Sequence, residues 1–460
     1  MRHRFVRKVF SVVSSFALVM SLVIPVAAHP SITEEDGVSQ HIQQVVANTS
    51  NASAIFGSTA LLADGSVYML GGNGNGQLGN GTKGGSSNVF VQVLKAPGVP
   101  LTGITRIYQN SGTMYAWSES EGKLYGWGRA FGGKLGVLGG TGSTPNDVVY
   151  ATELKFYGDK TLSELGIDFD GSHAQTLGGI AGADGTKPST LLAIAKDGKV
   201  YSWGSSGSAD RASNDFRLGR DISVGDAVYT MNGYASSLLP EQVVFNPSNP
   251  NERAIAVAGT DDVPGVNYIL SETGVLYAFG NGLTTQAEGT FVTVEHPDKA
   301  NGRKFVKMSV SSGGIVILLD DQGYIYTAFN TGDANNVYSA AARTATRPAA
   351  VYGDVTTGGI HNNAAAGITF KDVYAFGPTN NHVMFAIATD GTVYEWGASP
   401  GGNVHGVRFG DGTATSKTVS TAVENPYLKA VENMSMFRTT AAAVKGNVIY
   451  TWGYNAGVIS

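Results

Sequence analysis

The chain of 460 residues contains no cysteine. Disulfide bonds, thiol catalysis, cysteine metal sites and a lipidated N-terminal cysteine are therefore excluded. The histidines are scattered, without the HxxxH or HxH spacing of a local metal site. We assign no residue to catalysis, and the sequence predicts no metal and no cofactor.

Long hydrophobic runs are missing except near the start of the chain. Residues 9–24 form an apolar run interrupted only by serines, which follows four basic residues and precedes the small residues VAA at 26–28. This order predicts a signal peptide over residues 1–28, cleaved after Ala28, and a secreted or cell-surface protein. An uncleaved membrane anchor is the alternative, but the run is short for a span. We therefore expect no membrane span after cleavage.

Charged residues are also scarce, at 15% of the chain. Removal of residues 1–28 leaves 27 Lys and Arg against 36 Asp and Glu, a net charge of −9. Such a chain repels the phosphate backbone of nucleic acids. We expect no nucleic-acid partner.

Glycine, in contrast, is abundant at 62 residues beside only 15 prolines, which indicates many tight turns. One turn phrase, DGSVYMLG at 64–71, returns in six further copies. Asp-Gly between apolar stretches predicts a β-hairpin, because both turn positions favour a positive φ. Three residues after the turn Gly or Asn, each copy has a tyrosine: Tyr68, Tyr125, Tyr201, Tyr277, Tyr326, Tyr394 and Tyr450. Two residues further on stand Leu70, Trp127, Trp203, Phe279, Ala328, Trp396 and Trp452.

Other short strands can be placed around each copy, such as ITRIYQN, TMYAWSES, KLYGWGR and VVYATELK in the second unit. The tyrosines are separated by 49 to 76 residues, so constant strands are joined by variable loops. This pattern predicts an all-β fold, a seven-bladed β-propeller of four-stranded antiparallel blades, with the seven tyrosines buried between blades. The last unit supplies only three strands. Either residues 29–40 form a closing strand, or the sequence is a piece of a longer chain.

The stretch DGSVYMLGGNGNGQLGNGT at 64–82 resembles the repeat of the RCC1 (regulator of chromosome condensation) superfamily. The resemblance covers residues 41–460, although the Gly-rich part is degenerate elsewhere, for example GRAFGGKLGVLGGT in the second copy. It implies a seven-bladed propeller over 41–460, and here one of the secreted bacterial type. It does not imply one function, since members include a nuclear exchange factor, ubiquitin-ligase modules and secreted bacterial proteins.

The same stretch contains a formal GxGxxG, Gly74 to Gly79. A dinucleotide-binding loop must follow a strand and open a helix. Here the glycines follow the second strand of a hairpin and lead to another strand, VFVQVLK. We interpret them as residues that let the connection fold tightly over the end of a blade.

Function on a repeat fold tends to reside in variable loops. The long loops predicted here are 160–190, 205–240, 331–367 and 398–422, and the last three follow the Tyr-Trp strand, which places them on one face of the disc. Aromatic residues and arginine are enriched at binding hot spots. The candidate binding residues are Phe216, Arg217, Tyr229, Tyr234, Tyr338, Arg343, Arg408 and Phe409.

Two classes of function remain open. The first, which we favour, is a monomeric, non-catalytic binding propeller whose partner is a protein or a cell-surface glycan. The second is an extracellular enzyme, a lyase or glycan hydrolase, with its site in the central funnel. A fold of this kind hosts many functions, so the ligand does not follow from the fold.

Overall fold

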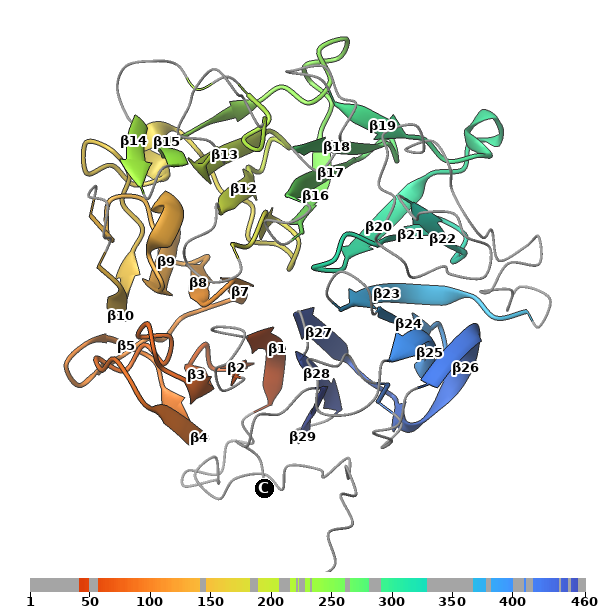
Figure 1. The fold of residues 1–460 in the computed structure, drawn as a ribbon, viewed down its shortest axis with the longest axis horizontal. Helices are drawn as coiled ribbons and strands as arrows, with labels where there is room; N and C mark the ends of the chain where they lie inside the picture. The colour runs from red at the N-terminus through yellow and green to blue at the C-terminus, as the bar shows by residue number, and fades with distance from the viewer. Residues whose placement is uncertain are drawn as a thin grey trace, which may run out of the picture.

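The computed structural model describes residues 41–48, 57–140, 146–182, 189–206, 216–220, 222, 228–231, 234–260, 265–280, 291–328, 367–377, 382–399, 409–410, 417–437, 440–445 and 448–453. The signal peptide predicted at 1–28 and the closing strand predicted at 29–40 lie outside these residues. Within them, seven antiparallel sheets follow one another around a ring, and the molecule is a seven-bladed β-propeller whose basic blade is four-stranded (Figure 1).

Each blade is built in chain order from the centre of the ring outward. Blade one contains β1 (Ile42–Asn48), β2 (Gly57–Leu62), β3 (Val67–Gly72) and β4 (Ser86–Gln92), and blade two contains β7 (Arg106–Asn110), β8 (Thr113–Ser118), β9 (Lys123–Gly128) and β10 (Val148–Glu153). Blade three contains β11 (Leu177–Gly178), β12 (Thr190–Ile194), β13 (Val200–Ser205) and β15 (Tyr234–Val243), with β14 (Val228–Met231) added outside. Blade four contains β16 (Ala254–Gly259), β17 (Val266–Ser271), β18 (Leu276–Gly280) and β19 (Val292–Val294).

The three remaining blades complete the ring. Blade five contains β20 (Phe305–Val310), β21 (Val316–Asp320) and β22 (Ile325–Ala328), and blade six contains β23 (Phe370–Phe376), β24 (Val383–Ala388), β25 (Thr392–Ser399) and β26 (Lys417–Lys429). Blade seven contains β27 (Asn433–Phe437), β28 (Thr440–Lys445) and β29 (Val448–Gly453). Outside the blades lie the ribbon β5 (Leu94–Ala96) with β6 (Val99–Pro100) and the short 3₁₀ turns η2 (Phe131–Gly133), η3 (Ser163–Leu165) and η4 (Lys299–Asn301).

The seven-fold phrase forms the turn and third strand of every blade, as predicted. Gly65 shows why the turn requires glycine: its φ is +80°, and a Cβ there would lie 2.8 Å from the backbone nitrogen of Ile104. The register then pairs Tyr68 with Ala60 across the hairpin, and Tyr125 with Ala116 in the next blade. The repeated residues therefore occupy equivalent positions between neighbouring blades.

The large apolar residue of the phrase is buried more deeply than the tyrosine. Trp127, Trp203 and Trp396 are 0% exposed. Of the seven tyrosines predicted to be buried, three are buried (Tyr125, Tyr277 and Tyr326) and four are half-buried (Tyr68, Tyr201, Tyr394 and Tyr450). The tryptophans of blades two, three and six are therefore buried more completely than the tyrosines of the same blades, whereas Trp452 of blade seven is half-buried.

Two predictions about loops were wrong. The segment 160–190 contains β11, the innermost strand of blade three, and the segment 205–240 contains β14 and part of β15, which pair as a hairpin. Of the other two predicted loops, 398–422 includes the start of β26, and nearly all of 331–367 lies outside the described residues.

The ring closes where blade one meets blade seven (Figure 1). Ile42, Val45 and Leu62 pack against Ala442 and Val444 in one buried cluster. Asn433 adds polar contacts, because its Oδ1 accepts from Val45 N at 3.3 Å and its Nδ2 donates to Gln43 O at 3.3 Å. Among the described strands, blade seven has the three that the sequence predicted, and closure occurs by packing between sheets.

Candidate functional site

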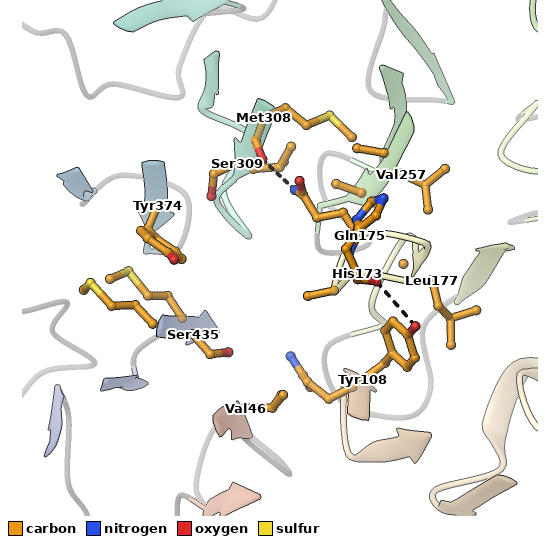
Figure 2. Close-up of a pocket in the computed structure, with 18 of the residues that line it drawn as sticks. Val46, Tyr108, His173, Gln175, Leu177, Val257, Met308, Ser309, Tyr374 and Ser435 are labelled. Carbon is orange, nitrogen blue, oxygen red and sulfur yellow. Dashed lines mark hydrogen bonds between the residues drawn. The ribbon is translucent and has the colours of Figure 1, made fainter. Parts of the chain in front are cut away.

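A cavity of about 610 Å³ lies at the centre of the ring. All seven innermost strands or the segments beside them line it, namely β1, β7, β11, β16, β20, β23 and β27. Figure 2 shows Tyr108 and His173 on one side and Tyr374 and Ser435 on the other. The site is therefore assembled from residues that span most of the chain.

The cavity has two different ends, because the innermost strands all run in the same direction along the axis. Arg106, His173, Lys307 and Asp372 lie before these strands or in their first three residues, and we call this end the N-terminal mouth. Cross-blade hydrogen bonds support the alignment: Arg106 Nη2 donates to Ser172 O at 2.7 Å, and Lys307 Nζ donates to Lys371 O at 2.8 Å.

The loops that follow the third strands lie at the opposite end. Antiparallel pairing makes the third strand run in the same direction as the first, so both end on the same face. The N-terminal mouth is therefore on the face opposite to the loops from which the candidate binding residues were chosen.

Gln175 reaches along the cavity wall from blade three to blade five. Its Nε2 donates to Met308 O at 2.6 Å, past the first strand of blade four (Figure 2). Tyr108 lies beside it, with its hydroxyl 3.0 Å from Thr176 Oγ1. Burial raises the pKa of Tyr108, so this phenol is a neutral hydrogen-bonding group.

His173 is a half-buried histidine of the mouth. Burial lowers its pKa below the ordinary value of 6.5; Asp170 opposes this shift, and the positive charges of Arg106 and Lys307 add to it. Its Nδ1 accepts from Gln175 N at 3.3 Å, so the neutral ring carries its hydrogen on Nε2. The imidazole is thus a neutral donor.

The charged groups of the mouth are unequally paired. Lys307 Nζ lies 3.3 Å from Asp372 Oδ2. Arg106 has no carboxylate within ion-pair distance among the described residues, and its buried Nε has no hydrogen-bond partner there. Among the described lining residues, Arg106 is therefore the cation without an ion-pair partner, and Asp170 is the anion that acts on His173.

The opposite wall combines an aromatic ring with methionines. Tyr374 lies near Ser435 (Figure 2), and its hydroxyl donates to Asp372 Oδ2 at 3.2 Å. Burial and the nearby Asp372 carboxylate raise the pKa of Tyr374. Met434 and Met436 also line the cavity.

The described lining contains one carboxylate, Asp372. Most glycoside hydrolases need two carboxyl groups on either side of the scissile bond, one as acid and one as base or nucleophile. The described lining therefore offers amides, hydroxyls and an arginine, and it does not hold a second carboxylate for such a pair.

The structure places three of the predicted binding residues in the core. Phe216 is 7% exposed and packs edge-on against Phe279, Arg217 is 5% exposed, and Phe409 is 3% exposed in the cluster of blades six and seven. Tyr229 lies on β14 and Tyr234 begins β15, but the structure does not describe their side chains. Tyr338, Arg343 and Arg408 lie outside the described residues.

The burial of Arg217 follows from its place in the Gly-rich repeat. Gln77, Lys134 and Arg217 each precede Leu-Gly, and the carbonyl of each accepts a hydrogen bond from the next blade. Trp127 Nε1 donates to Gln77 O at 2.8 Å, Trp203 Nε1 donates to Lys134 O at 3.0 Å, and Asn267 Nδ2 donates to Arg217 O at 2.7 Å. Where Phe279 replaces the tryptophan, Asn267 supplies the missing donor. An alignment of the tripeptides QLG at 77–79, KLG at 134–136, RLG at 217–219 and RFG at 408–410 could have revealed this packing role from the sequence.

Two short sequences match serine-nucleophile motifs only in form. GASPG at 397–401 fits GxSxG, and SEGK at 120–123 fits SxxK. The first motif requires a strand followed by a helix, whereas Ser399 ends a β-strand that is followed in the described chain by another strand. Lys123 forms ion pairs with Glu121 and Glu153 at the blade edge, so it is not aimed at Ser120. Neither motif has the geometry of a nucleophile site.

In the part of the chain that the structure describes, no three His, Asp or Glu side chains are grouped as metal ligands. No helix in that part is long and apolar enough to cross a membrane.

Comparison with known proteins identifies the class of fold. No family model and no curated protein matches the sequence. Among solved structures, the chain is similar to yeast RCC1 (Prp20) bound to Kap60, with a TM-score of 0.50, 15% identity and coverage of 90% of this chain and 81% of that chain. It is also similar to human WBSCR16, with a TM-score of 0.46, 14% identity and coverage of 76% and 72%. The molecule is an RCC1-like seven-bladed β-propeller.

Proposed function

We propose that the protein is a secreted or cell-surface binding module without catalytic activity, and that its ligand is a protein or a cell-surface glycan. The observation that carries this proposal is the composition of the central cavity. Among the residues that the structure describes, amides, hydroxyls and aromatic rings line it together with one carboxylate, and such groups orient a ligand by hydrogen bonding.

The fold supports a binding role in general terms. Yeast RCC1, a propeller of this kind, was crystallised with its protein partner Kap60. The net charge of −5 for the whole chain argues against a nucleic-acid partner. Secretion is proposed from the signal-peptide pattern of residues 1–28 alone.

The second candidate is an extracellular lyase in the funnel. The positive charge of Arg106 would suit a uronate substrate, but Nδ1 of His173 is occupied by the Gln175 amide, which leaves this ring without a free basic nitrogen. This arrangement favours retention of a ligand over proton abstraction from it.

An affinity experiment separates the two candidates. The mature protein would be immobilised, used to capture components from the surface of the source cell, and incubated separately with the same glycans to detect cleavage. Retention without new chain ends supports the binding module. Catalytic release of unsaturated or hydrolysed products would replace it with the enzyme, and failure to retain any surface component would contradict it.

A further inference from the structure

The described lining of the cavity holds more cationic than anionic side chains, whereas the whole chain has a net charge of −5. Among the described lining residues, Arg106 and Lys307 face one carboxylate, Asp372, and Asp170 acts on His173 from outside the lining. A cleft of one sign in a low-dielectric wall concentrates ligands of the other sign. Lys307 is paired with Asp372, so Arg106 is the cation of the lining that has no carboxylate within ion-pair distance among the described residues.

Arg106 retains unused hydrogen-bonding capacity. A guanidinium has five N–H donors in a fixed fork. The Nη2 atom donates to Ser172 O, and among the described residues neither Nη1 nor the buried Nε has a partner; of these two, Nη1 is the atom that is not buried. Arginine with free donors in one plane matches a carboxylate, which can accept two parallel hydrogen bonds.

Neutral groups continue from Arg106 into the cavity. His173 follows the residue whose carbonyl Arg106 binds, and its protonated Nε2 supplies a further donor. Gln109, on the same strand as Arg106, has a buried Oε1 that lacks a donor among the described residues. A ligand with both a carboxylate and hydroxyl groups would accept from Arg106 through its carboxylate and donate to Gln109 Oε1 through a hydroxyl.

Ring-shaped ligands also fit the opposite wall. Tyr374 and Ser435 face the cavity opposite His173 (Figure 2). Aromatic faces pack against the C–H surfaces of sugars, and serine hydroxyls and amides bind sugar hydroxyls. A peptide carboxylate would use Arg106 but would leave these hydroxyl-binding groups with less to bind.

We propose that the N-terminal mouth binds a uronic-acid unit of an acidic glycan, with its carboxylate on Arg106 and its hydroxyls toward His173 and Gln109. This inference rests on the proposed binding function and specifies its ligand class. It places the site on the face opposite to the loops after the third strands.

Calorimetric titration with tetrasaccharides of galacturonate, alginate and hyaluronan tests the proposal. The parent protein is expected to bind at least one of them, and at least ten-fold more weakly in its fully methyl-esterified form, which has the same backbone without the charge. Equal affinity for acid and ester, or no binding of any of the three, would overturn the proposal. Inorganic phosphate that competes as strongly as the tetrasaccharide would show an unspecific anion site and would also overturn it.

Variants locate the site. Arg106→Gln is expected to weaken binding at least ten-fold, and Arg106→Lys to weaken it less, because the charge is kept and the fork is lost. Lys299→Gln is the matched control, since Lys299 is exposed, is paired with Glu295 and lies outside the cavity. Thermal unfolding of each variant establishes that it is folded. If Arg106→Gln is folded and binds like the parent, the mouth is not the site.

The outcomes also separate this inference from the proposed function. Capture of a surface component that binds Arg106→Gln and the parent equally would leave the binding module intact and remove only the uronate site.

Discussion

Trp203 joins two blades through both its ring and its N–H group. The ring is 0% exposed and packs edge-on against Phe156 at 5.3 Å, while Nε1 donates to the carbonyl of Lys134. Lys134 itself is buried, and its Nζ donates to the carbonyls of Asn110 and Ser111. Burial removes water from this amino group and lowers its pKa. Three oxygen acceptors, the two carbonyls and Asn110 Oδ1, replace the lost hydration.

Replacement of Trp203 separates packing from hydrogen bonding. Trp203→Ala should lower the free energy of unfolding by about 3–5 kcal/mol, because it leaves a large cavity between blades. Trp203→Phe should lower it by less, about 1–2 kcal/mol, because the Lys134 carbonyl still accepts from Tyr115. Urea unfolding measures both values. Tyr201→Phe, two residues away and half-buried, is the control; a loss from it as large as from Trp203→Phe would contradict this division.

His173 gives a pH dependence with a defined sign. Its pKa is lower in the folded protein than the ordinary 6.5, because burial disfavours the imidazolium; Asp170 opposes this shift, and Arg106 and Lys307 add to it. The unfolded chain therefore binds the proton more readily, and stability that is present above pH 6.5 is lost as the pH falls below this value. His173→Asn should reduce the fall in melting temperature between pH 6.5 and 5. An unchanged pH profile would show that other groups cause it.

At the scale of elements, the third strand was predicted in every blade, and first strands were predicted in several blades, such as ITRIYQN for β7, whereas the first strand of blade three was not. The third strand carries Asp-Gly or a relative, then Tyr and a large apolar residue, so its turn chemistry and packing repeat together. The first strand of blade three is only Leu177–Gly178, inside a polar segment with no repeat signal. Tertiary pairing with β12 makes it a strand, and no local propensity could have indicated this.

Gln175 shows how such an irregular segment is held. Gln175→Ala removes the hydrogen bond to Met308 O and should lower the free energy of unfolding by about 0.5–1.5 kcal/mol, the usual net value of one hydrogen bond. Gln43→Ala is the matched control, because Gln43 lines the same cavity but is exposed. Denaturant unfolding of the pair measures the difference. Equal stability of the two variants would mean that the Gln175 bond contributes nothing.

At the scale of the whole molecule, the site could not be read from the sequence. The candidate residues were chosen by type from segments between strands, and Phe216, Arg217 and Phe409 proved to belong to buried repeat positions. The cavity residues Arg106, His173 and Tyr374 are distant in sequence and meet only because the ring brings seven innermost strands together. The number of blades, in contrast, follows directly from the number of repeat phrases.

Closure should make the ring unfold as one unit. Ala442 is 0% exposed between blades seven and one, so Ala442→Asp buries a carboxylate against Ile42 and Val45. We expect a single calorimetric transition at a much lower temperature, with Lys445→Asp, at a half-buried position on the same strand, changing it little. An early separate transition with the remainder unfolding at the parent temperature would instead indicate independent blades, as in an open solenoid.

The contact between the first and last blades also delays the burial of the first blade during biosynthesis. Ile42 and Val45 are buried by Ala442, Val444 and Ile449, which are made about 400 residues later. At roughly 5–20 residues per second, the ribosome needs on the order of 20–80 s to make this stretch. Throughout that time the apolar side of the first blade has no native partner, so a chaperone or the export machinery would have its longest opportunity to bind the nascent protein there.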